Sequence, residues 1–157
     1  MSVNGVLPDA VDLLDERSRE AYVGILICVA AADGDLVREE SAAIEAAMGR
    51  AMIRPNRREL MRPWLVEPPN LDDLLENISE DALRVTLRDS LIIAAVDGDY
   101  HESEIDIIKK ISNASGITSN ELESLTAWVE DGWRLMAKGR GILGVTLPGD
   151  DKLISKK

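Results

Sequence analysis

The sequence predicts an all-α fold, built as two pseudo-symmetric tandem helical repeats packed as one bundle. Composition favours helices over strands, because the chain has no Phe and only 2 Tyr while Ala, Leu and Ile are abundant. An internal duplication predicts the two repeats, since Ala-Ala-Ala-Asp-Gly-Asp at 30–35 returns as Ala-Ala-Val-Asp-Gly-Asp at 94–99. The 64-residue register holds without a gap for Ala30/Ala94, Asp33/Asp97, Gly34/Gly98, Asp35/Asp99, Glu40/Glu104, Ile44/Ile108, Ile53/Ile117 and Asn56/Asn120. A register kept over that length indicates a copied segment.

The length of the chain limits its domain organisation. With 157 residues it can bury one proper core, whereas two separate domains would each be marginal. We therefore expect one helical domain over residues 1–138, with halves at about 18–66 and 79–138 that join at Glu67-Pro68-Pro69-Asn70. Residues 139–157 contain glycines, a proline and no helical period, so they are expected to form a C-terminal tail, either disordered or packed on the outside.

Apolar periodicity and caps predict the helices of the first half at about 9–16, 19–32, 38–52 and 55–64. Ser18 is the expected N-cap of the second of these helices, and Gly34 is its expected stop. Because residues 25–32 are apolar on every side, this helix is expected to be buried.

The helices of the second half are expected at about 71–78, 80–96, 102–114 and 119–138. Ser79 is the expected cap of the second, Gly116 ends the third, and Thr118 with Glu121 forms a capping box for the fourth. The apolar ends 27–32 and 91–96 are expected to pack against each other at the centre. The last helix is expected to bury Leu122, Leu125, Trp128, Val129 and either Trp133 or Met136.

Charge and cysteine content exclude several classes of protein. A formal net charge of −11 argues against nucleic acid as a partner, because phosphate affinity comes from clustered Lys and Arg, and it suits a protein that attracts cations or basic partners. The single cysteine, Cys28, lies in an apolar run, which excludes an internal disulfide and a cysteine-based zinc site. No signal-peptide pattern opens the chain, and the longest apolar run, 23–32, is about half of a membrane span. A cytoplasmic location without a transmembrane segment is expected.

Each copy of the repeated phrase places two aspartates around a glycine and a glutamate at the start of the next helix. Hard cations such as Ca²⁺, Mg²⁺ and Mn²⁺ bind several oxygens. The candidate metal ligands are therefore Asp33, Asp35, Glu40, Asp97, Asp99 and Glu104. Both turns match the Asp-Gly-x5-Glu ending of an EF-hand, but the earlier ligand positions hold Val29 and Ala31, or Ile93 and Ala95. A complete EF-hand is not expected.

The same acidic residues also have a structural interpretation. An aspartate in a tight turn accepts hydrogen bonds from nearby amides, and a glutamate at the third helical position reaches back to the N-cap amide. Caps are commoner than metal ligands. Six uncompensated carboxylates in neighbouring turns would repel one another, which favours a bound cation. His101, at the position matching Val37, is either a ligand in the second turn or a solvent-facing side chain.

No catalytic activity and no cofactor other than a divalent cation are expected. One His and one buried Cys offer no nucleophile with a base and an orienting group. The three tryptophans are expected to fill helix contacts. The basic run Arg54, Arg57, Arg58 and Arg62 is expected to be a solvated helix face rather than a docking surface.

Two tandem helical repeats, each ending an Ala-rich helix in Ala-x-Asp-Gly-Asp and reaching Glu40 or Glu104 at the next helix start, resemble the tellurite-resistance TerB family over about Ala21 to Ala137. The resemblance implies an all-α fold with the acidic turns on one surface. It implies that Asp33, Asp35, Glu40, Asp97, Asp99 and Glu104 bind a metal or a partner. It also implies a stress-response role linked to tellurite resistance, in cytoplasmic complexes or complexes at the inner face of the membrane. Where the family often has Ser or Thr caps, this chain has Val37 and His101.

The sequence therefore predicts a non-enzymatic TerB-like module that binds a divalent cation or a partner protein through its two Asp-Gly-Asp turns. Two alternatives stay open. The six carboxylates could form the two-metal site of a metal-dependent hydrolase. The chain could also be a structural scaffold in which the acidic residues are only caps.

Overall fold

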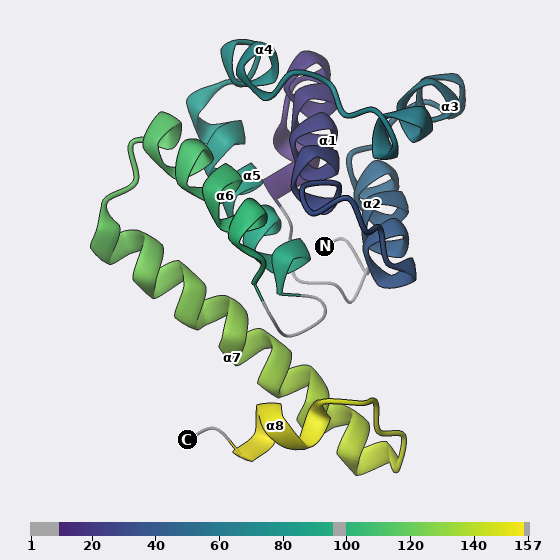
Figure 1. Cartoon of the computed structure of the whole chain (residues 1–157), viewed down its shortest axis with the longest axis vertical. Helices are drawn as coiled ribbons and strands as arrows, with labels where there is room; N and C mark the ends of the chain where they lie inside the picture. The colour runs from purple at the N-terminus through teal and green to yellow at the C-terminus, as the bar shows by residue number, and fades with distance from the viewer. Residues whose placement is uncertain (1–9, 96–99, 156–157) are drawn as a thin grey trace.

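A computed structural model describes residues 10–95 and 100–155, and every regular element within these ranges is helical (Figure 1). The order is η1 (Ala10–Leu13), α1 (Glu16–Ala30), α2 (Arg38–Arg50), α3 (Pro55–Met61), η2 (Arg62–Leu65), α4 (Leu71–Glu76), α5 (Glu80–Ala94), α6 (Glu102–Ser115), α7 (Ser119–Leu143) and α8 (Asp150–Ser155). The predicted all-α class is confirmed. The expected helix end at Val96 lies outside the described residues.

The duplication read from the sequence is present in the helix boundaries. Helices α5, α6 and α7 each begin 64 residues after α1, α2 and α3. The helix ends also match: α1 closes at Ala31 with φ −88° and ψ 1°, and α5 closes at Ala95 with φ −91° and ψ 1°. The two halves are therefore copies of one arrangement, which differ mainly in the length of their third helix.

Helix α1 forms the centre of the bundle, as the apolar run that begins at Ile25 predicts. All residues from 21 to 30 are buried, and α5 is the helix that packs against α1 most extensively. Each fully buried Ile or Leu contributes about 1.5 to 3 kcal/mol relative to an exposed one. Gly24 permits a close approach, because a Cβ at this position would lie 3.1 Å from both terminal carbons of Leu74 and 3.5 Å from the ring of Trp64. The α4 and η2 segments thus pack directly on the α1 backbone.

A buried polar contact also joins the two halves. The hydroxyl of Tyr22 on α1 donates to Asp89 Oδ2 on α5 at 2.6 Å, and Arg88 donates to Asp89 Oδ1 at 2.7 Å. Burial, and then the negative charge of Asp89, raise the pKa of Tyr22 well above its usual range. The buried carboxylate of Asp89 thus receives the hydrogen-bond donors that a charged group in the core needs.

The start of α1 differs from the sequence prediction. Asp15, not Ser18, is the N-cap: its Oδ1 accepts from the Ser18 amide at 2.8 Å, and the Ser18 hydroxyl donates to Oδ2 at 3.0 Å. The helix therefore begins three residues earlier than expected, because Asp15 caps the helix and Ser18 serves as its partner. These bonds lower the pKa of Asp15.

The helix ends of the second half agree better with expectation. Ser79 caps α5 by accepting from the Ala82 amide at 3.3 Å. Gly116 ends α6 with φ 68°, the left-handed conformation that glycine adopts without steric cost. The Thr118 and Glu121 capping box is formed by reciprocal bonds of 3.2 and 2.8 Å.

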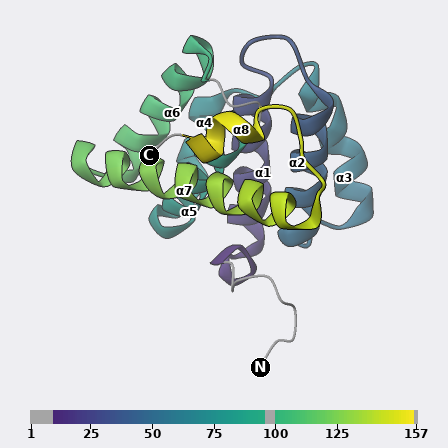
Figure 2. The same ribbon diagram turned by 90° about the horizontal axis from the view of Figure 1, so that it is seen from below.

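The C-terminal region differs most from the prediction. Helix α7 continues to Leu143 instead of ending near Lys138, and α8 follows it within the expected tail. Figure 2 shows α8 lying alongside α7, and the guanidinium of Arg140 donates to both oxygens of Asp150 at 2.9 and 2.6 Å. We call residues 134–155 the C-terminal arm: the last part of α7 extends beyond the other helices (Figure 1), and α8 packs on it.

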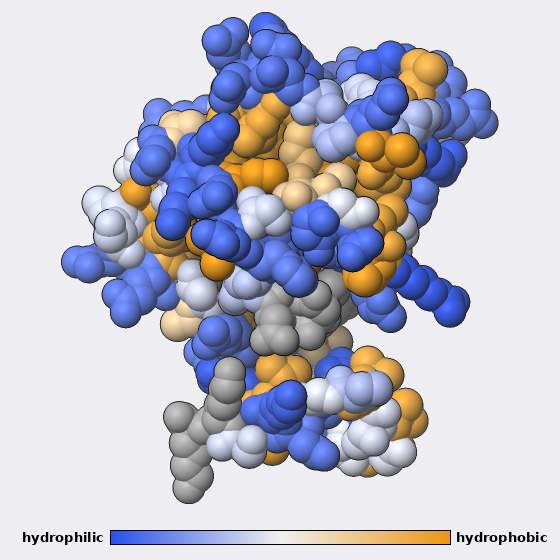
Figure 3. Space-filling model, in the orientation of Figure 1, coloured by the Kyte–Doolittle hydropathy of each residue, from blue (hydrophilic) through white to orange (hydrophobic). Residues whose placement is uncertain are grey.

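The burial expected along α7 is confirmed only in part. Val129 is buried, and Leu122, Leu125 and Trp133 pack against the core, so the choice between Trp133 and Met136 falls on Trp133. Trp128 and Met136 are more than half exposed. The reason is that the N-terminal part of α7 packs against the other helices and its C-terminal part extends beyond them. The apolar residues of the C-terminal part therefore have few neighbours to pack against. Apolar residues consequently remain at the surface of the arm (Figure 3).

Candidate functional site

The first acidic turn connects α1 to α2. The amide of Ala31 donates to Ile27 O at 2.9 Å and closes α1, and Gly34 follows with φ 79°. The Asp33 Oδ1 atom accepts from the Asp35 amide at 3.0 Å, which is the side-chain turn expected of an aspartate before glycine. Asp35 itself is exposed. The turn therefore uses one aspartate to fix its own backbone and presents the other to solvent.

The two glutamates of the repeated phrase are buried caps. Glu40 is 3% exposed and its Oε2 accepts from the Val37 amide at 3.1 Å. Glu104 is 1% exposed and its Oε2 accepts from the His101 amide at 2.9 Å. Neither Val37 nor His101 returns a side-chain cap, so only the glutamate half of each box is formed. The structural interpretation of these two residues is thus confirmed, whatever further role they have.

The fold brings the residue before α6 to the first acidic turn. His101 Nε2, just before α6, lies 3.6 Å from Asp33 Oδ2, and it forms an ion pair with that carboxylate when the imidazole is protonated. This contact follows from the central pairing of α1 with α5, which places the ends of both helices side by side. His101 is exposed over about half of its side chain. The sequence placed His101 in the second turn but gave no signal that it reaches the first.

Only part of the predicted cation site lies in the described structure. Asp97 and Asp99, the aspartates of the second turn, lie outside the described residues. Across residues 10–95 and 100–155, no three His, Cys, Asp or Glu side chains gather closely enough to hold a metal ion. The six-carboxylate site therefore stays a prediction.

Tyr100 is a residue beside the site that the sequence interpretation did not single out. Its hydroxyl is buried and accepts or donates no hydrogen bond within the described residues. Burial raises its pKa, and the negative charges of Glu130 and Glu104 raise it further. Leu36 holds the matching position in the first copy, so the difference between the two copies was the available signal.

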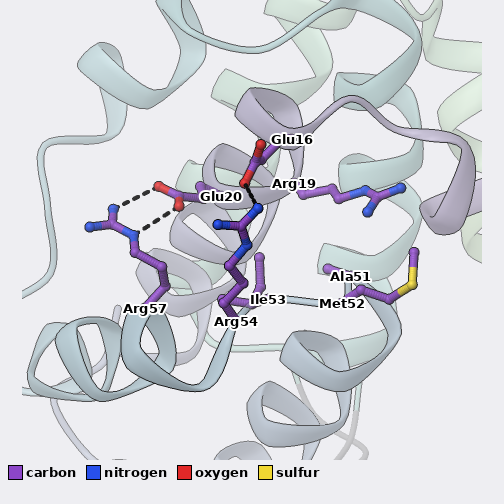
Figure 4. Close-up of a pocket in the computed structure, with 8 residues that line it drawn as sticks. All are labelled: Glu16, Arg19, Glu20, Ala51, Met52, Ile53, Arg54 and Arg57. Atoms are coloured by element: carbon purple, nitrogen blue, oxygen red, sulfur yellow. Dashed lines mark hydrogen bonds and ion pairs between the residues drawn. The ribbon is translucent and has the colours of Figure 1, made fainter.

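A hollow of about 230 Å³ lies at the opposite end of α1 from the acidic turns (Figure 4). Its walls carry charges that are already paired: Arg57 donates to both oxygens of Glu20 at 2.9 and 2.8 Å, and Arg54 lies 3.6 Å from Glu16. Arg62 donates to both oxygens of Glu45 at 2.7 and 3.3 Å, and Arg58 donates to the carbonyl of Ile53 at 2.7 Å. Three arginines of the predicted solvated face are thus paired with carboxylates of the protein and the fourth with its main chain. The ion pair with Glu20 raises the pKa of Arg57.

Cys28 behaves as the core residue that the sequence predicted. It is buried in α1, and its thiol donates to the carbonyl of Pro69 at 3.4 Å. Burial raises its pKa to about 11, so the thiolate that nucleophilic chemistry needs is disfavoured at neutral pH.

None of the helices described is both long enough and apolar enough to cross a membrane. No family model and no solved structure matches the chain. Two curated proteins match, each named co-chaperone protein DjlA, from Vibrio vulnificus strains CMCP6 and YJ016. Each is 28% identical over 142 residues, which cover 84% of this chain and 49% of the relative. The chain thus spans about half the length of the curated relatives it matches.

Proposed function

We propose that this chain is a non-enzymatic helical module that binds a partner protein in a chaperone-associated complex. Similarity to two co-chaperones over most of the chain supports the chaperone context. The observation that carries the binding role is the contact between His101 and Asp33, which joins the first acidic turn to the start of α6. The lack of enzymatic activity is supported by the chain's single His and single Cys, of which the Cys is buried and has a raised pKa.

The surface formed by the first acidic turn and the starts of α2 and α6 has the chemistry of a protein-binding surface. Asp35, Glu39 and Glu102 are exposed around them and supply negative charge. Leu36 and Val37 are exposed between these acids and supply apolar contact area. Acidic side chains around exposed apolar ones fit a basic, amphipathic segment of another protein, because charge steers the encounter and apolar burial holds the complex.

A finer proposal follows from the resemblance to the TerB family. The module then belongs to a stress response of the tellurite-resistance type and acts in the cytoplasm, with complexes at the inner face of the membrane as its other location. Nucleic acid is not a proposed partner, given the net charge of −11.

A divalent cation, Ca²⁺, Mg²⁺ or Mn²⁺, is a second candidate ligand for the same surface. The contact of Asp33 with His101, the residue before α6, supports it, since aspartates from both copies would have to act together. One oxygen of Glu40 and one of Glu104 are engaged by backbone amides, so Asp33, Asp35 and the second-turn aspartates would carry most of the coordination. A hydrolase that uses these carboxylates remains the enzymatic alternative, and a scaffold without a ligand the structural one.

The partner proposal is tested by biolayer interferometry against a panel of purified chaperones. The test variant carries Asp35→Asn, Glu39→Gln and Glu102→Gln. The matched control removes the same charge from exposed positions on or beside α3 and α4, with Glu59→Gln, Glu67→Gln and Glu76→Gln. We expect the wild type and the control to bind the same chaperone with an affinity that falls at high salt, and the test variant to bind at least tenfold more weakly. Equal binding by all three, or no binding by the wild type, would refute it.

The cation proposal is tested by calorimetric titration with Ca²⁺, Mg²⁺, Mn²⁺ and Zn²⁺. The comparison is between the wild type and the double variant Asp33→Asn with Asp97→Asn. Binding heat and a rise in melting temperature that are lost in the variant support a metal site. If titration of the wild type gives no binding heat, the cation proposal is wrong and the carboxylates act as helix caps and partner contacts. Turnover of phosphate or amide esters that depends on the same aspartates would instead establish the hydrolase.

A further inference from the structure

One side of α7 repeats a large and small pattern. Trp128, Gly132, Leu135, Gly139 and Ile142 follow one another at spacings of four and three, so they lie in a line along the helix. Large side chains alternate with glycines along this line. Trp128 and Leu135 are each followed, four residues later, by a glycine that leaves a notch in the helix surface. This arrangement fits a second helix that carries the same pattern.

This line is at the surface of the molecule. Trp128 is 53% exposed, Leu135 70% and Ile142 87%, and the neighbouring Met136 and Leu143 are 58% and 76% exposed. We call these five side chains, with Gly132 and Gly139 between them, the α7 face. None of its seven residues is charged.

The described part of the chain does not cover the α7 face. Helix α8 docks on the other side of α7, where Ala137 is buried and Arg140 bonds to Asp150. Ala137 lies about 200° around the helix from Leu135. A Cβ added at Gly132 or at Gly139 would meet no atom within 4 Å, so both notches are open.

Charge also separates this region from the rest of the protein. The chain has a net charge of −11, yet the C-terminal arm has four basic residues, Arg134, Lys138, Arg140 and Lys152, and only two acidic ones, Asp150 and Asp151. Because the arm extends away from the acidic body (Figure 1), two copies that meet through their arms keep the repelling charges apart.

We propose that the α7 face binds the α7 face of a second copy of this chain and forms a symmetric dimer. In such a dimer the large residues of one helix enter the glycine notches of the other, and each helix offers both parts of the contact. A surface with both parts is self-complementary, which is what a two-fold interface requires. The glycines let the two backbones approach closely.

The available area is sufficient for a weak dimer. Five side chains that are 53% to 87% exposed present about 600 to 700 Å² per copy, taking about 200 Å² for one fully exposed side chain of this size. Stable interfaces start at about 600 Å² per partner. The dimer is therefore expected to form in the micromolar range. Raised salt strengthens it, because salt screens the repulsion between the acidic bodies.

The test is sedimentation equilibrium of the full chain from about 1 to 200 μM. Gly139→Gln fills a notch in the α7 face, and Leu135→Gln removes one of its large residues. Gly141→Gln is the matched control, since Gly141 lies on the opposite side of α7, is also exposed and has no atom near its added Cβ. Both glycine substitutions favour the helix equally. Equal rises in the melting temperatures of Gly139→Gln and Gly141→Gln, measured at low protein concentration, show that these two variants fold.

The wild type and Gly141→Gln are expected to approach twice the mass of one chain at the upper concentrations. Gly139→Gln and Leu135→Gln are expected to stay at the mass of one chain, with a dissociation constant at least tenfold higher. A wild type that remains monomeric throughout overturns the proposal, as does equal loss in Gly139→Gln and Gly141→Gln. Flotation with phosphatidylserine vesicles that weakens with salt and is abolished by Leu135→Gln, in a monomeric protein, would assign the face to lipid instead.

Discussion

The left-handed turn at Gly116 allows a direct test of how the helix ends are stabilised. Gly116 has φ 68°, and no atom lies within 4 Å of a Cβ built there. Replacement by alanine therefore changes backbone conformational energy without a steric clash. The left-handed conformation costs an L-residue about 1 to 2 kcal/mol. The smaller conformational freedom of alanine in the unfolded chain returns about 0.4 to 1 kcal/mol. The net loss for Gly116→Ala is about 1 kcal/mol.

The control has the same chemistry and the opposite sign. Gly49 lies within α2, is exposed, and likewise has no atom within 4 Å of an added Cβ. Gly49→Ala is therefore expected to stabilise the protein by about 0.5 to 1 kcal/mol through helix propensity. For a chain of this size these changes correspond to about 2 to 4 °C per kcal/mol, downward for Gly116→Ala and upward for Gly49→Ala.

The assay is urea unfolding followed by circular dichroism, with thermal melts as a second measure, at a protein concentration low enough to keep the chain monomeric. Slopes of the unfolding free energy against urea should be equal in all three proteins, so that shifts in midpoint report stability. A Gly116→Ala variant as stable as the wild type would show that the reasoning from backbone conformation is wrong. So would changes in unfolding free energy of the same sign for Gly116→Ala and Gly49→Ala. The first copy gives a natural comparison, because Met52, at the position matching Gly116, has φ 53°.

Three further predictions concern buried or paired groups. Tyr22→Phe removes the donor to Oδ2 of the buried Asp89, leaves Arg88 as the donor to Oδ1, and is expected to cost about 2 kcal/mol in urea unfolding. Because the pKa of Tyr22 is raised, the wild type should also lose stability as pH rises above about 10, where the unfolded tyrosine ionises, and the variant should lose less. The pKa of Asp150 is lowered to about 2 by Arg140, so the NMR shifts of the α8 amides should change as pH falls from about 4 to 2, and an unchanged α8 there would contradict the ion pair. Cys28, with its pKa raised to about 11, should resist a disulfide reagent at pH 8 and react once urea unfolds the chain; rapid reaction of the folded protein would show that the thiol is accessible.

The sequence was sufficient for the architecture because its signals were local and repeated. The apolar run in α1, the glycine after α6 and the box at Thr118 each act within one or two helical turns, and each is confirmed. The N-cap of α1 was misassigned because Asp15 and Ser18 are both good caps and bond to each other. Sequence alone does not rank two such neighbours.

The candidate site could be predicted only in its parts. Local rules identified Glu40 and Glu104 as caps, since a glutamate at the third helical position reaches its own N-cap amide. The approach of His101 to Asp33 depends on how the two halves pack, and no local pattern encodes it. The C-terminal end of α7 was not predicted to be helical, because its glycines weaken the helical signal. Its ion pair between Arg140 and Asp150 involves a later segment of the chain, which a local pattern does not reveal.

The enclosed position of α1 has a consequence for how the chain assembles. Its surroundings come from both copies, with α2 and α4 on one part of its surface and α5 and α6 on another. A fragment cut at Pro68-Pro69, between the copies, would therefore expose the buried residues 21–30 of α1, and the other fragment would lack the helix that packs in its core. Neither fragment should fold alone, both should reassemble when mixed, and the intact chain should unfold in a single step even though its gene arose by duplication.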